Sequence, residues 1–257
     1  MKVATWNVNS LRARMGIVLP WLEAQRPDVL CLQETRVADD QFPHEPLEAI
    51  GYHVVFRGDK GRNGVAVVSA REPDEVHVGF DDGEAADEDR LLAVRVGGVP
   101  IVNTYVPQGR DPDHEMFQVK LAWFGRLRRF FDRHYHTSEP LLWVGDFNVA
   151  PEAIDVHDPK RLDGQVGFHP LERAALAEVA AWGFVDLLRK HNPEPGQYTF
   201  YDYRARDPVT RGIGWRVDHI WATAALAERS TAARIDTGPR LAERPSDHTP
   251  LLAEFDV

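Results

Sequence analysis

The stretch Leu141-Leu142-Trp143-Val144-Gly145-Asp146-Phe147-Asn148 passes from an apolar run directly into a carboxylate and an amide. A short apolar run of this kind, bounded by glycine, predicts a buried β-strand over Leu141–Gly145. Asp146 and Asn148 then follow the strand at the edge of its sheet, where polar side chains can meet. The segment therefore predicts a fold in which buried strands end in a shared rim of polar residues.

Short apolar or β-rich runs alternate with helical stretches on both sides of this segment. Further strands are predicted at Lys2–Val8, Val29–Gln33, Tyr52–Arg57, Val65–Ser69, Glu75–Gly79, Leu91–Val96, Pro100–Val106, Val217–Ala222 and Pro250–Phe255. Helices are predicted at Gly16–Gln25, His114–His136 and Leu171–Trp182, and surface loops at Asp81–Asp89 and Asn192–Gln197. Hairpin signals such as Gly97-Gly98 are frequent, which favours an α/β (α+β) fold of two face-to-face sheets with helices outside over a purely parallel sheet.

Length and composition restrict the class of protein. The chain has 257 residues, of which 43% are hydrophobic and 27% charged, as is ordinary for a globular protein. We expect a single domain over residues 1–257, because no linker or shift in composition divides it. No stretch of eighteen apolar residues and no secretory signal are visible, so no membrane association is expected. The one cysteine, Cys31, lies in an apolar run, which fits a reducing, cytoplasmic compartment.

The formal net charge of −10 bears on the choice of partner. Taken alone it argues against nucleic acid, because phosphate binders usually carry a basic face. Net charge, however, says little about the local field of a cleft. A carboxylate-rich metal site also adds acidity at a place where a bound cation reverses the local sign. Nucleic acid therefore stays among the candidate partners.

Polar residues gather where the predicted strands end. They are Asn7 and Asn9, Gln33 and Glu34, Tyr105 and Gln108, Asp146 and Asn148, Asp218, and Ser246, Asp247 and His248. Oxygen ligands of this kind suit Mg²⁺ or Mn²⁺, whereas zinc prefers several histidines or cysteines. Carboxylates, an Asp–His pair and a metal are the parts needed for metal-assisted phosphoryl hydrolysis.

Each of these residues also has a structural reading. Glu34 can be a solvent-facing carboxylate, and Asp146 with Asn148 can form a simple Asx turn. A lone His248 is more often a helix-cap or core histidine, and Tyr105 is more often a packing aromatic. The functional reading therefore depends on the joint appearance of these residues.

Ten motifs carry a resemblance that runs almost from end to end of the chain. They are TWNVNSLRAR (Thr5–Arg14), PDVLCLQET (Pro27–Thr35), GVAVVS (Gly64–Ser69), NTYVPQG (Asn103–Gly109), WVGDFNVAP (Trp143–Pro151), GFHPLER (Gly167–Arg173), WGFVDLLR (Trp182–Arg189), YTFYDYR (Tyr198–Arg204), GWRVDH (Gly214–His219) and PSDHTPL (Pro245–Leu251). With these motifs in this order, the sequence resembles the exonuclease III family of apurinic/apyrimidinic endonucleases, within the endonuclease/exonuclease/phosphatase superfamily. The resemblance implies a four-layer αββα sandwich of two mixed sheets flanked by helices.

The resemblance also implies roles for individual residues. Glu34 is the expected main protein ligand of Mg²⁺, with Mn²⁺ as a substitute, and Asn7 lies beside it. Asp146 resembles the family's catalytic aspartate, which activates water or manages the proton of the leaving oxygen. Asn148 is expected to orient that water or the phosphate and to lie with Asp146 at the metal, and Tyr105 is expected to contact the scissile phosphate.

The remaining catalytic roles concern an Asp–His pair and the residues beside it. Asp218 is expected to hydrogen-bond His248 and favour its imidazolium, which then steadies a phosphate oxygen at the metal site. Asp247 is expected near the metal or a second metal. Asn9 and Gln108 are expected to contact DNA phosphates or to support the site.

Substrate choice is expected beside the catalytic residues. Phe200 and Trp215 match positions that wall a small apolar pocket in the family, which would accept a flipped abasic sugar and exclude a normal base. Phosphate-gripping loops are expected at Arg57–Asn63, Gln108–Asp111 and Tyr203–Arg211. The DNA contacts expected within them are Arg62, Asn63, Gln108 and Arg204.

The expected activity is a Mg²⁺-dependent DNA repair phosphodiesterase, an exodeoxyribonuclease III-like enzyme. It would incise duplex DNA 5′ to abasic sites, act 3′→5′ on DNA ends, and leave a 3′-hydroxyl after in-line attack of water. The expected partner is double-stranded DNA with abasic sites or blocked 3′ ends, bound by a monomer. Two alternatives remain: a small-molecule or lipid phosphodiesterase on the same fold, and a DNA-binding relative without catalysis.

Overall fold

The computed structural model describes residues 1–59, 61–84 and 87–257. Lys60, in the predicted Arg57–Asn63 loop, lies outside the described residues, as do Ala85 and Ala86 in the predicted Asp81–Asp89 loop. Within these ranges, none of the helices is both long and apolar enough to cross a membrane.

Two six-stranded sheets form the centre of the molecule. Sheet A has the order β11 (Ser230–Ile235), β12 (Leu251–Phe255), β1 (Lys2–Asn7), β2 (Val29–Gln33), β4 (Val65–Ser69) and β3 (His53–Arg57). Sheet B has the order β5 (Glu75–Val78), β6 (Leu91–Val96), β7 (Val99–Tyr105), β8 (Leu142–Asp146), β10 (Asp218–Thr223) and β9 (Phe184–Asp186). Each sheet is mixed, because one pair of strands in each is parallel: β1 with β2, and β7 with β8.

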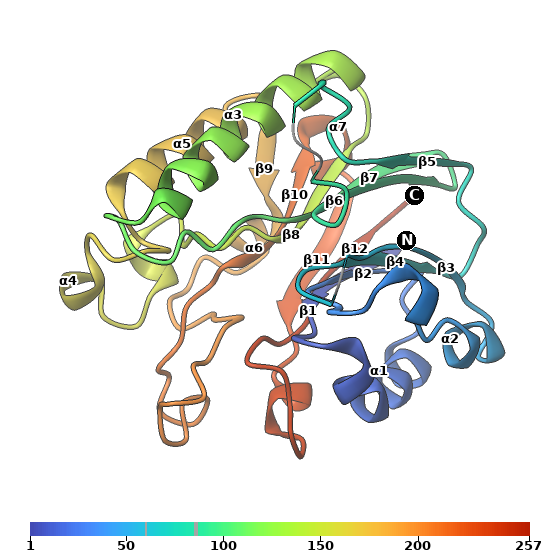
Figure 1. Cartoon of the computed structure of the whole chain (residues 1–257), viewed down its shortest axis with the longest axis horizontal. Helices are drawn as coiled ribbons and strands as arrows, with labels where there is room; N and C mark the ends of the chain where they lie inside the picture. The colour runs from blue at the N-terminus through green and yellow to red at the C-terminus, as the bar shows by residue number, and fades with distance from the viewer. Residues whose placement is uncertain (60, 85–86) are drawn as a thin grey trace.

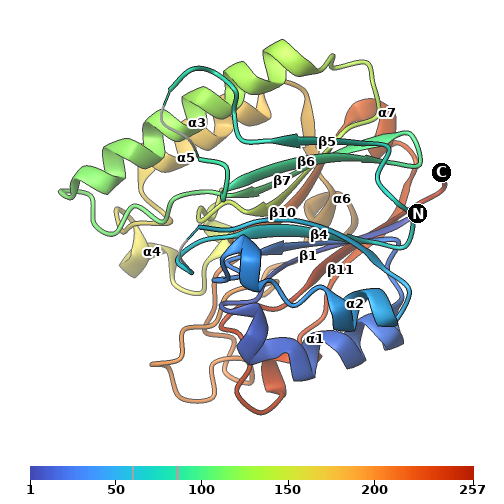
Figure 2. The same cartoon turned by 45° about the vertical axis from the view of Figure 1, so that its right-hand side comes forward.

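Helices α1 (Leu11–Gln25) and α2 (Glu45–Ala49) cover the outer face of sheet A, and α3 (Glu115–His134) and α5 (Pro170–Ala180) cover that of sheet B. Two short helices, α6 (Leu187–His191) and α7 (Ala224–Ala227), instead pack against the core between the sheets. Among the described residues, the remaining helix is α4 (Pro159–Leu162), and 3₁₀ turns lie at Asp39–Gln41, Ala153–Asp155 and Gly238–Leu241. In Figures 1 and 2, α1 and α2 lie below sheet A, and α3 and α5 lie above sheet B. The predicted four-layer αββα sandwich is thereby confirmed.

Apolar side chains fill each of the three spaces between the layers. One cluster, which includes Val67 of sheet A and Ile101 of sheet B, lies between the sheets. A second packs sheet B against α3 and α5, and a third packs sheet A against α1 and α2. The core between the sheets is shared by strands from the N-terminal and C-terminal halves of the chain. One domain over residues 1–257 remains a prediction.

The topology brings several strand ends to one rim. Parallel neighbours need a crossover, and α1 and α3 supply it for β1–β2 and β7–β8. Each crossover returns the chain to the starting edge, so that paired strands end side by side. Tyr105 at the end of β7 therefore lies opposite Asp146 at the end of β8, and Asp146 lies opposite Asp218 at the start of β10.

Most predicted elements are confirmed within one or two residues at their ends. The Gly97-Gly98 hairpin is present, with φ of 58° and 82°, as a two-residue turn with both residues left-handed requires. The start of α1 was wrong: the helix begins at Leu11 instead of Gly16, because Leu11 is already buried against sheet A. The short strands β9 and β11 and the one-turn helices α2, α4, α6 and α7 were not predicted.

Candidate active site

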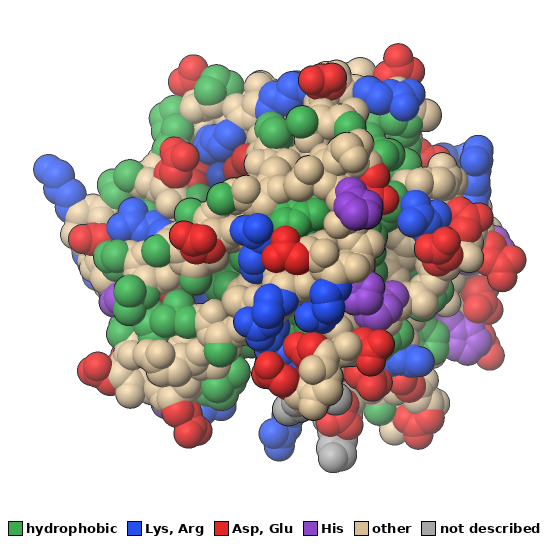
Figure 3. Space-filling model, turned by 90° about the horizontal axis from the view of Figure 1, so that it is seen from above, with side chains coloured by type: hydrophobic (Ala, Val, Ile, Leu, Met, Phe, Trp, Pro, Cys, Tyr) green, Lys and Arg blue, Asp and Glu red, His purple; other side chains and the backbone are tan. Residues whose placement is uncertain are grey.

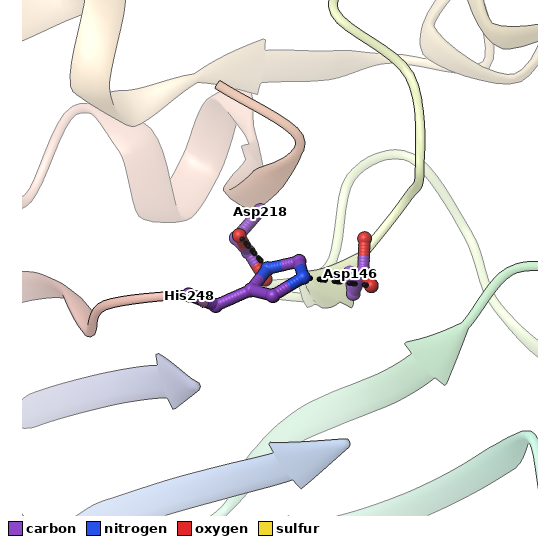
Figure 4. A group of neighbouring side chains, drawn as sticks. All are labelled: Asp146, Asp218 and His248. Carbon is purple, nitrogen blue, oxygen red and sulfur yellow. Dashed lines mark hydrogen bonds and ion pairs between the residues drawn. The ribbon is translucent and has the colours of Figure 1, made fainter. Parts of the chain in front are cut away.

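A carboxylate–imidazole cluster lies where the two sheets meet the rim. Asp146, Asp218 and His248 each offer a ligand atom, and these atoms lie within 4.8 Å of one another. His248 Nδ1 donates to Asp218 Oδ2 at 2.8 Å, and its Nε2 lies 4.0 Å from Asp146 Oδ2. Figure 4 shows the imidazole between the two carboxylates. All three side chains are buried, so their mutual charges act at low local dielectric.

A glycine makes this approach of strands possible. Gly145 has φ of 137°, and a Cβ atom there would lie 1.9 Å from the Thr104 carbonyl oxygen of β7. Only glycine therefore lets β8 pass so close to β7 and deliver Asp146 beside Tyr105.

Asn7 joins the cluster to sheet A. Its Nδ2 donates to Glu34 Oε2 and to Asp146 Oδ2, both at 2.9 Å, so one amide holds two carboxylates that come from different sheets. On the other side of the rim, Asn9 donates to Asp247 Oδ1 at 2.8 Å. The cluster thus extends from Asp218 through Asp146 to Glu34.

Burial and charge shift the protonation of the cluster. Burial and the neighbouring Asp218 raise the pKa of Asp146 to about 7, against the opposing effect of His248. Burial works against a charged His248, but Asp218 and Asp146 outweigh it and raise the pKa of His248 to about 10. The imidazole is therefore protonated at neutral pH, and Asp146 is able to exchange a proton in that range.

The donor set fits a hard divalent cation. Asp146 and Asp218 supply carboxylate oxygens next to a single imidazole, and Asn7 holds a third carboxylate, that of Glu34, beside them. Asp218 Oδ1 is buried without a hydrogen-bond partner in the described part of the chain. Oxygen-dominated sets of this kind favour magnesium-like ions over zinc. The side chains predicted to bind the metal therefore lie close together, in or directly behind the lining of one cleft. The ligand role of each residue remains a prediction.

Tyr105 and Asn148 close the cluster toward the cleft. Asn148, with φ of 52°, donates from Nδ2 to Asp146 Oδ2 at 3.2 Å and to the Val106 carbonyl at 2.9 Å. Burial, followed by Glu34 and Asp146, raises the pKa of Tyr105, so its phenol keeps its proton and can donate. Both side chains line the same cavity as the carboxylates.

An open cleft of about 970 Å³ lies over the cluster. Ten of the predicted site residues line it: Glu34, Tyr105, Gln108, Asp146, Asn148, Phe200, Arg204, Trp215, Asp247 and His248. Phe200 and Trp215 pair as backbone neighbours, and the Phe200 ring lies 5.0 Å from the His248 ring. The predicted apolar wall therefore stands beside the predicted catalytic histidine.

Five predicted residues lie outside the cleft lining. Asn7 and Asp218 are fully buried behind it, and Asn9 holds Asp247. Arg62 and Asn63 lie in the loop before β4, and Asn63 bonds Asp89 and Arg90. For Arg62 and Asn63, contact with DNA remains a prediction.

Three cations at the site were missed from the sequence. Arg36 bonds Glu34 directly, and Arg90 lies 4.7 Å above the Tyr105 ring and bonds its carbonyl. Lys120 is fully buried behind Asn148. Two of these cations could have been found in the sequence. Arg36 follows Glu34 by two residues, which indicates a candidate ion pair. Lys120 stands on the apolar stripe of a predicted helix, which indicates a buried charge.

The comparisons with known proteins identify the family and the fold. Residues 4–248 match the model of the Endonuclease/Exonuclease/phosphatase family. The chain is 36% identical to exodeoxyribonuclease III of Haemophilus influenzae, over 99% of this chain and 100% of the relative. It is similar to the solved structure of an AP endonuclease from Archaeoglobus fulgidus, with a TM-score of 0.97, 50% identity and full coverage of both chains.

A further solved structure shows a 3′ phosphatase from Neisseria bound to a product DNA hairpin. Its TM-score to this chain is 0.95 at 38% identity, again with full coverage of both chains. The family match runs from Ala4 to His248, so it includes every residue of the cluster at the rim and ends shortly before β12. The chain therefore belongs to the Endonuclease/Exonuclease/phosphatase family.

Proposed function

We propose that this protein is an exodeoxyribonuclease III-like DNA repair enzyme that incises duplex DNA 5′ to abasic sites and acts 3′→5′ on DNA ends. One observation carries the proposal: Glu34, Asp146 and His248 line one open cleft, and the buried Asn7 and Asp218 hold them from behind by hydrogen bonds. Full-length similarity to an exodeoxyribonuclease III and to an AP endonuclease supports it. The same relatives lend no support to a lipid or small-molecule substrate.

The cleft suits a charged backbone with an extruded sugar. Phe200 and Trp215 supply an apolar wall beside His248, while Arg204 and Arg161 also line the cavity. An abasic sugar would fit against this wall, whereas a base would add bulk there, and extrusion costs least where no base is stacked. Duplex DNA with abasic sites or blocked 3′ ends is therefore the substrate that we propose.

Magnesium is the cation that we propose, with manganese as its substitute. Glu34 and Asp146, held together by Asn7, would be its first protein ligands. A bound divalent cation would supply Lewis-acid polarisation of the phosphate and a lowered pKa of water. Asp247, Asn148 and His248 would complete the surroundings of the ion, because they line the same cavity.

The side chains of the chain itself would divide the work of hydrolysis. His248, kept protonated by Asp218, would donate to a phosphate oxygen as negative charge builds up. Tyr105 would donate a second hydrogen bond to that phosphate. Asp146 would take the proton of the attacking water or return one to the leaving oxygen, since its carboxylate lies at the floor of the cleft within reach of Asn148 and the imidazole of His248. In-line attack would leave a 3′-hydroxyl and a 5′-phosphate.

We also propose that the enzyme works as a monomer in a reducing, cytoplasmic compartment. Its single cysteine, Cys31, is buried in the core between the sheets.

A gel assay tests the proposed substrate. End-labelled duplexes with an abasic site, a 3′-phosphate or a plain recessed end are compared in one Mg²⁺ buffer. We expect a single nick at the abasic site and release of the 3′-phosphate. The proposal fails if none of the duplexes is cut, or if a phosphorylated sugar or lipid headgroup is hydrolysed in their place.

A further inference from the structure

A buried ion pair lies behind the cleft, between two helices of the outer layer. Lys120 of α3 and Glu172 of α5 bond each other, and both side chains have 0% exposure. Lys120 occupies the apolar stripe of α3, one turn from Phe117 and Phe124, which are also buried. A buried charge is costly unless it is paired and fully hydrogen-bonded, so its other contacts are informative.

The ammonium group of Lys120 has three donors, and each has a partner. One goes to Glu172, one to the Asn148 carbonyl at 2.7 Å and one to the Gln108 carbonyl at 3.3 Å. Asn148 follows β8 and Gln108 follows β7. Lys120 therefore ties the backbones of two loops that carry predicted site residues.

The carboxylate of Glu172 ties a third loop. Its Oε2 accepts from the backbone N–H groups of Gly167 at 2.8 Å and His169 at 3.2 Å. Gly167 lines the cleft, and its carbonyl accepts from Ala150 N at 2.7 Å. A Cβ atom at Gly167 would lie 3.3 Å from the Trp215 ring, so this loop packs directly against the apolar wall.

We propose that Lys120 and Glu172 are positioning residues for DNA cleavage, because their ion pair fixes the three loops that present Gln108, Asn148 and Gly167 to the substrate. The proposal rests on the proposed nuclease function. Charge-assisted hydrogen bonds hold backbone more tightly than neutral ones. The backbone of Asn148 must be held in place, since its Nδ2 bonds Asp146 Oδ2 and its conformation, with φ of 52°, sets the direction of that side chain.

Paired substitutions separate positioning from simple stabilisation. Lys120→Met combined with Glu172→Leu removes both charges together, so neither is left unpaired in the core. Arg126→Met is the matched control, because Arg126 also lies on α3 and is buried in ion pairs with Asp82 and Asp87. Neither of these aspartates lines the cleft.

Two quantities are measured for each variant: the single-turnover incision rate on an abasic duplex in Mg²⁺, and the DNA Kd in EDTA. For the double variant we expect a rate about tenfold to a hundredfold below wild type, as small misplacements of reacting groups produce. We expect its Kd to stay within about threefold, and Arg126→Met to keep the wild-type rate despite a lower Tm. A wild-type rate in the double variant, or equal rate losses in both variants, would overturn the positioning role.

Glu172→Gln provides a second test if the double variant does not fold. The amide keeps the shape of the side chain but has one acceptor oxygen, so either Lys120 or the Gly167 loop loses its partner. A reduced incision rate with an unchanged DNA Kd supports the inference, and an unchanged rate contradicts it. Failure of the wild-type enzyme to incise DNA would instead overturn the proposed function.

Discussion

His248 owes its charge to two carboxylates that it touches. Asp218 accepts from Nδ1 at 2.8 Å and Asp146 lies 4.0 Å from Nε2, so burial does not neutralise the ring. Its pKa of about 10 means that the imidazolium persists over the whole physiological range. A phosphate oxygen in the cleft would therefore meet a fixed cationic donor.

Replacing Asp218 with Asn should reduce the incision rate by about a hundredfold, as expected when one preorganised electrostatic group is lost. Without the Asp218 charge the pKa of His248 falls, so the variant should lose more activity at pH 9 than at pH 6. Single-turnover rates at the two pH values measure both effects. A rate within about threefold of wild type at pH 9 would remove the pair from the mechanism.

Replacing Glu34 with Gln should raise the Mg²⁺ concentration needed for half-maximal incision by about tenfold or more, because a carboxylate ligand becomes a neutral amide. The side chain keeps its size and an oxygen near Asn7 Nδ2. A titration of Mg²⁺ from micromolar to tens of millimolar measures the change. An unaltered titration curve would place the cation away from Glu34.

At the scale of elements, buried salt bridges fasten the start of β10 to its neighbours. Arg216 donates from Nε and Nη2 to Asp155, at 2.7 and 3.0 Å, and from Nη1 to His219 Nδ1 at 3.0 Å. His219 Nε2 then donates to the Val149 carbonyl at 2.9 Å. Since Nδ1 accepts and Nε2 donates, His219 is a neutral ring, and burial and Arg216 lower its pKa to about 4.

This neutral histidine should make stability fall in acid. Between pH 6.5 and 4 the unfolded chain binds a proton at His219 that the folded chain does not bind, so stability decreases as the pH falls. At pH 5 the loss should be about 2 kcal/mol relative to pH 7.5.

His219→Gln is the matched variant, because an amide can accept from Arg216 and donate to Val149 but does not titrate. Urea denaturation at pH 7.5 and 5 measures both proteins. The variant should be less stable than wild type at pH 7.5 and should lose that disadvantage at pH 5. Parallel losses in the two proteins would show that His219 binds a proton equally well in the folded state.

The elements that the sequence predicted best are those with one strong local signal. The apolar run Leu141–Gly145 and the Gly97-Gly98 turn needed no tertiary information. β11 was missed because Ser230–Ile235 has small and polar residues and becomes a strand only by pairing with β12. Lys120 was assigned no role, because its partners come from separate parts of the chain. They are the carbonyls of Gln108 and Asn148 and the carboxylate of Glu172, and only the folded structure brings them to the ammonium group.

At the scale of the whole molecule, an acidic chain is proposed to bind a polyanion. Over the face shown in Figure 3, acidic and basic side chains are interspersed, so the net charge of −10 does not form one uniform field there. Arg110, Arg161 and Arg204 line the cleft together with the carboxylates. The local electrostatic potential of the cleft, and not the net charge of the chain, therefore decides whether phosphate is attracted.

DNA affinity in EDTA should fall steeply with salt, because Arg and Lys contacts to phosphate release counterions. Arg204→Gln should lower the slope of log Kd against log salt by about one, since it removes a single phosphate contact. Fluorescence anisotropy at salt concentrations from about 50 to about 300 mM measures the slope. A flat response in the wild-type protein would mean that the basic side chains of the cleft do not touch DNA.

Overall architecture and the residues of the rim were both predictable, because strands that share crossovers must end together. The distances were not predictable: no sequence pattern states that Asn7 reaches carboxylates of both sheets. Nor does the sequence show that Arg62 and Asn63 lie outside the cleft while Arg161 lines it. Such facts depend on loop conformation and on contacts between residues far apart in the chain.

Cleavage of an end-labelled duplex with one abasic site, by wild type and by Asp146→Asn, in Mg²⁺ and in EDTA, tests the hydrolytic cluster most directly. Wild type in Mg²⁺ should yield one product with a 3′-hydroxyl immediately 5′ to the abasic site. That product should be absent in EDTA and reduced by about a hundredfold or more in Asp146→Asn. Incision at the wild-type rate in EDTA, or by Asp146→Asn in Mg²⁺, would contradict hydrolysis at this cluster.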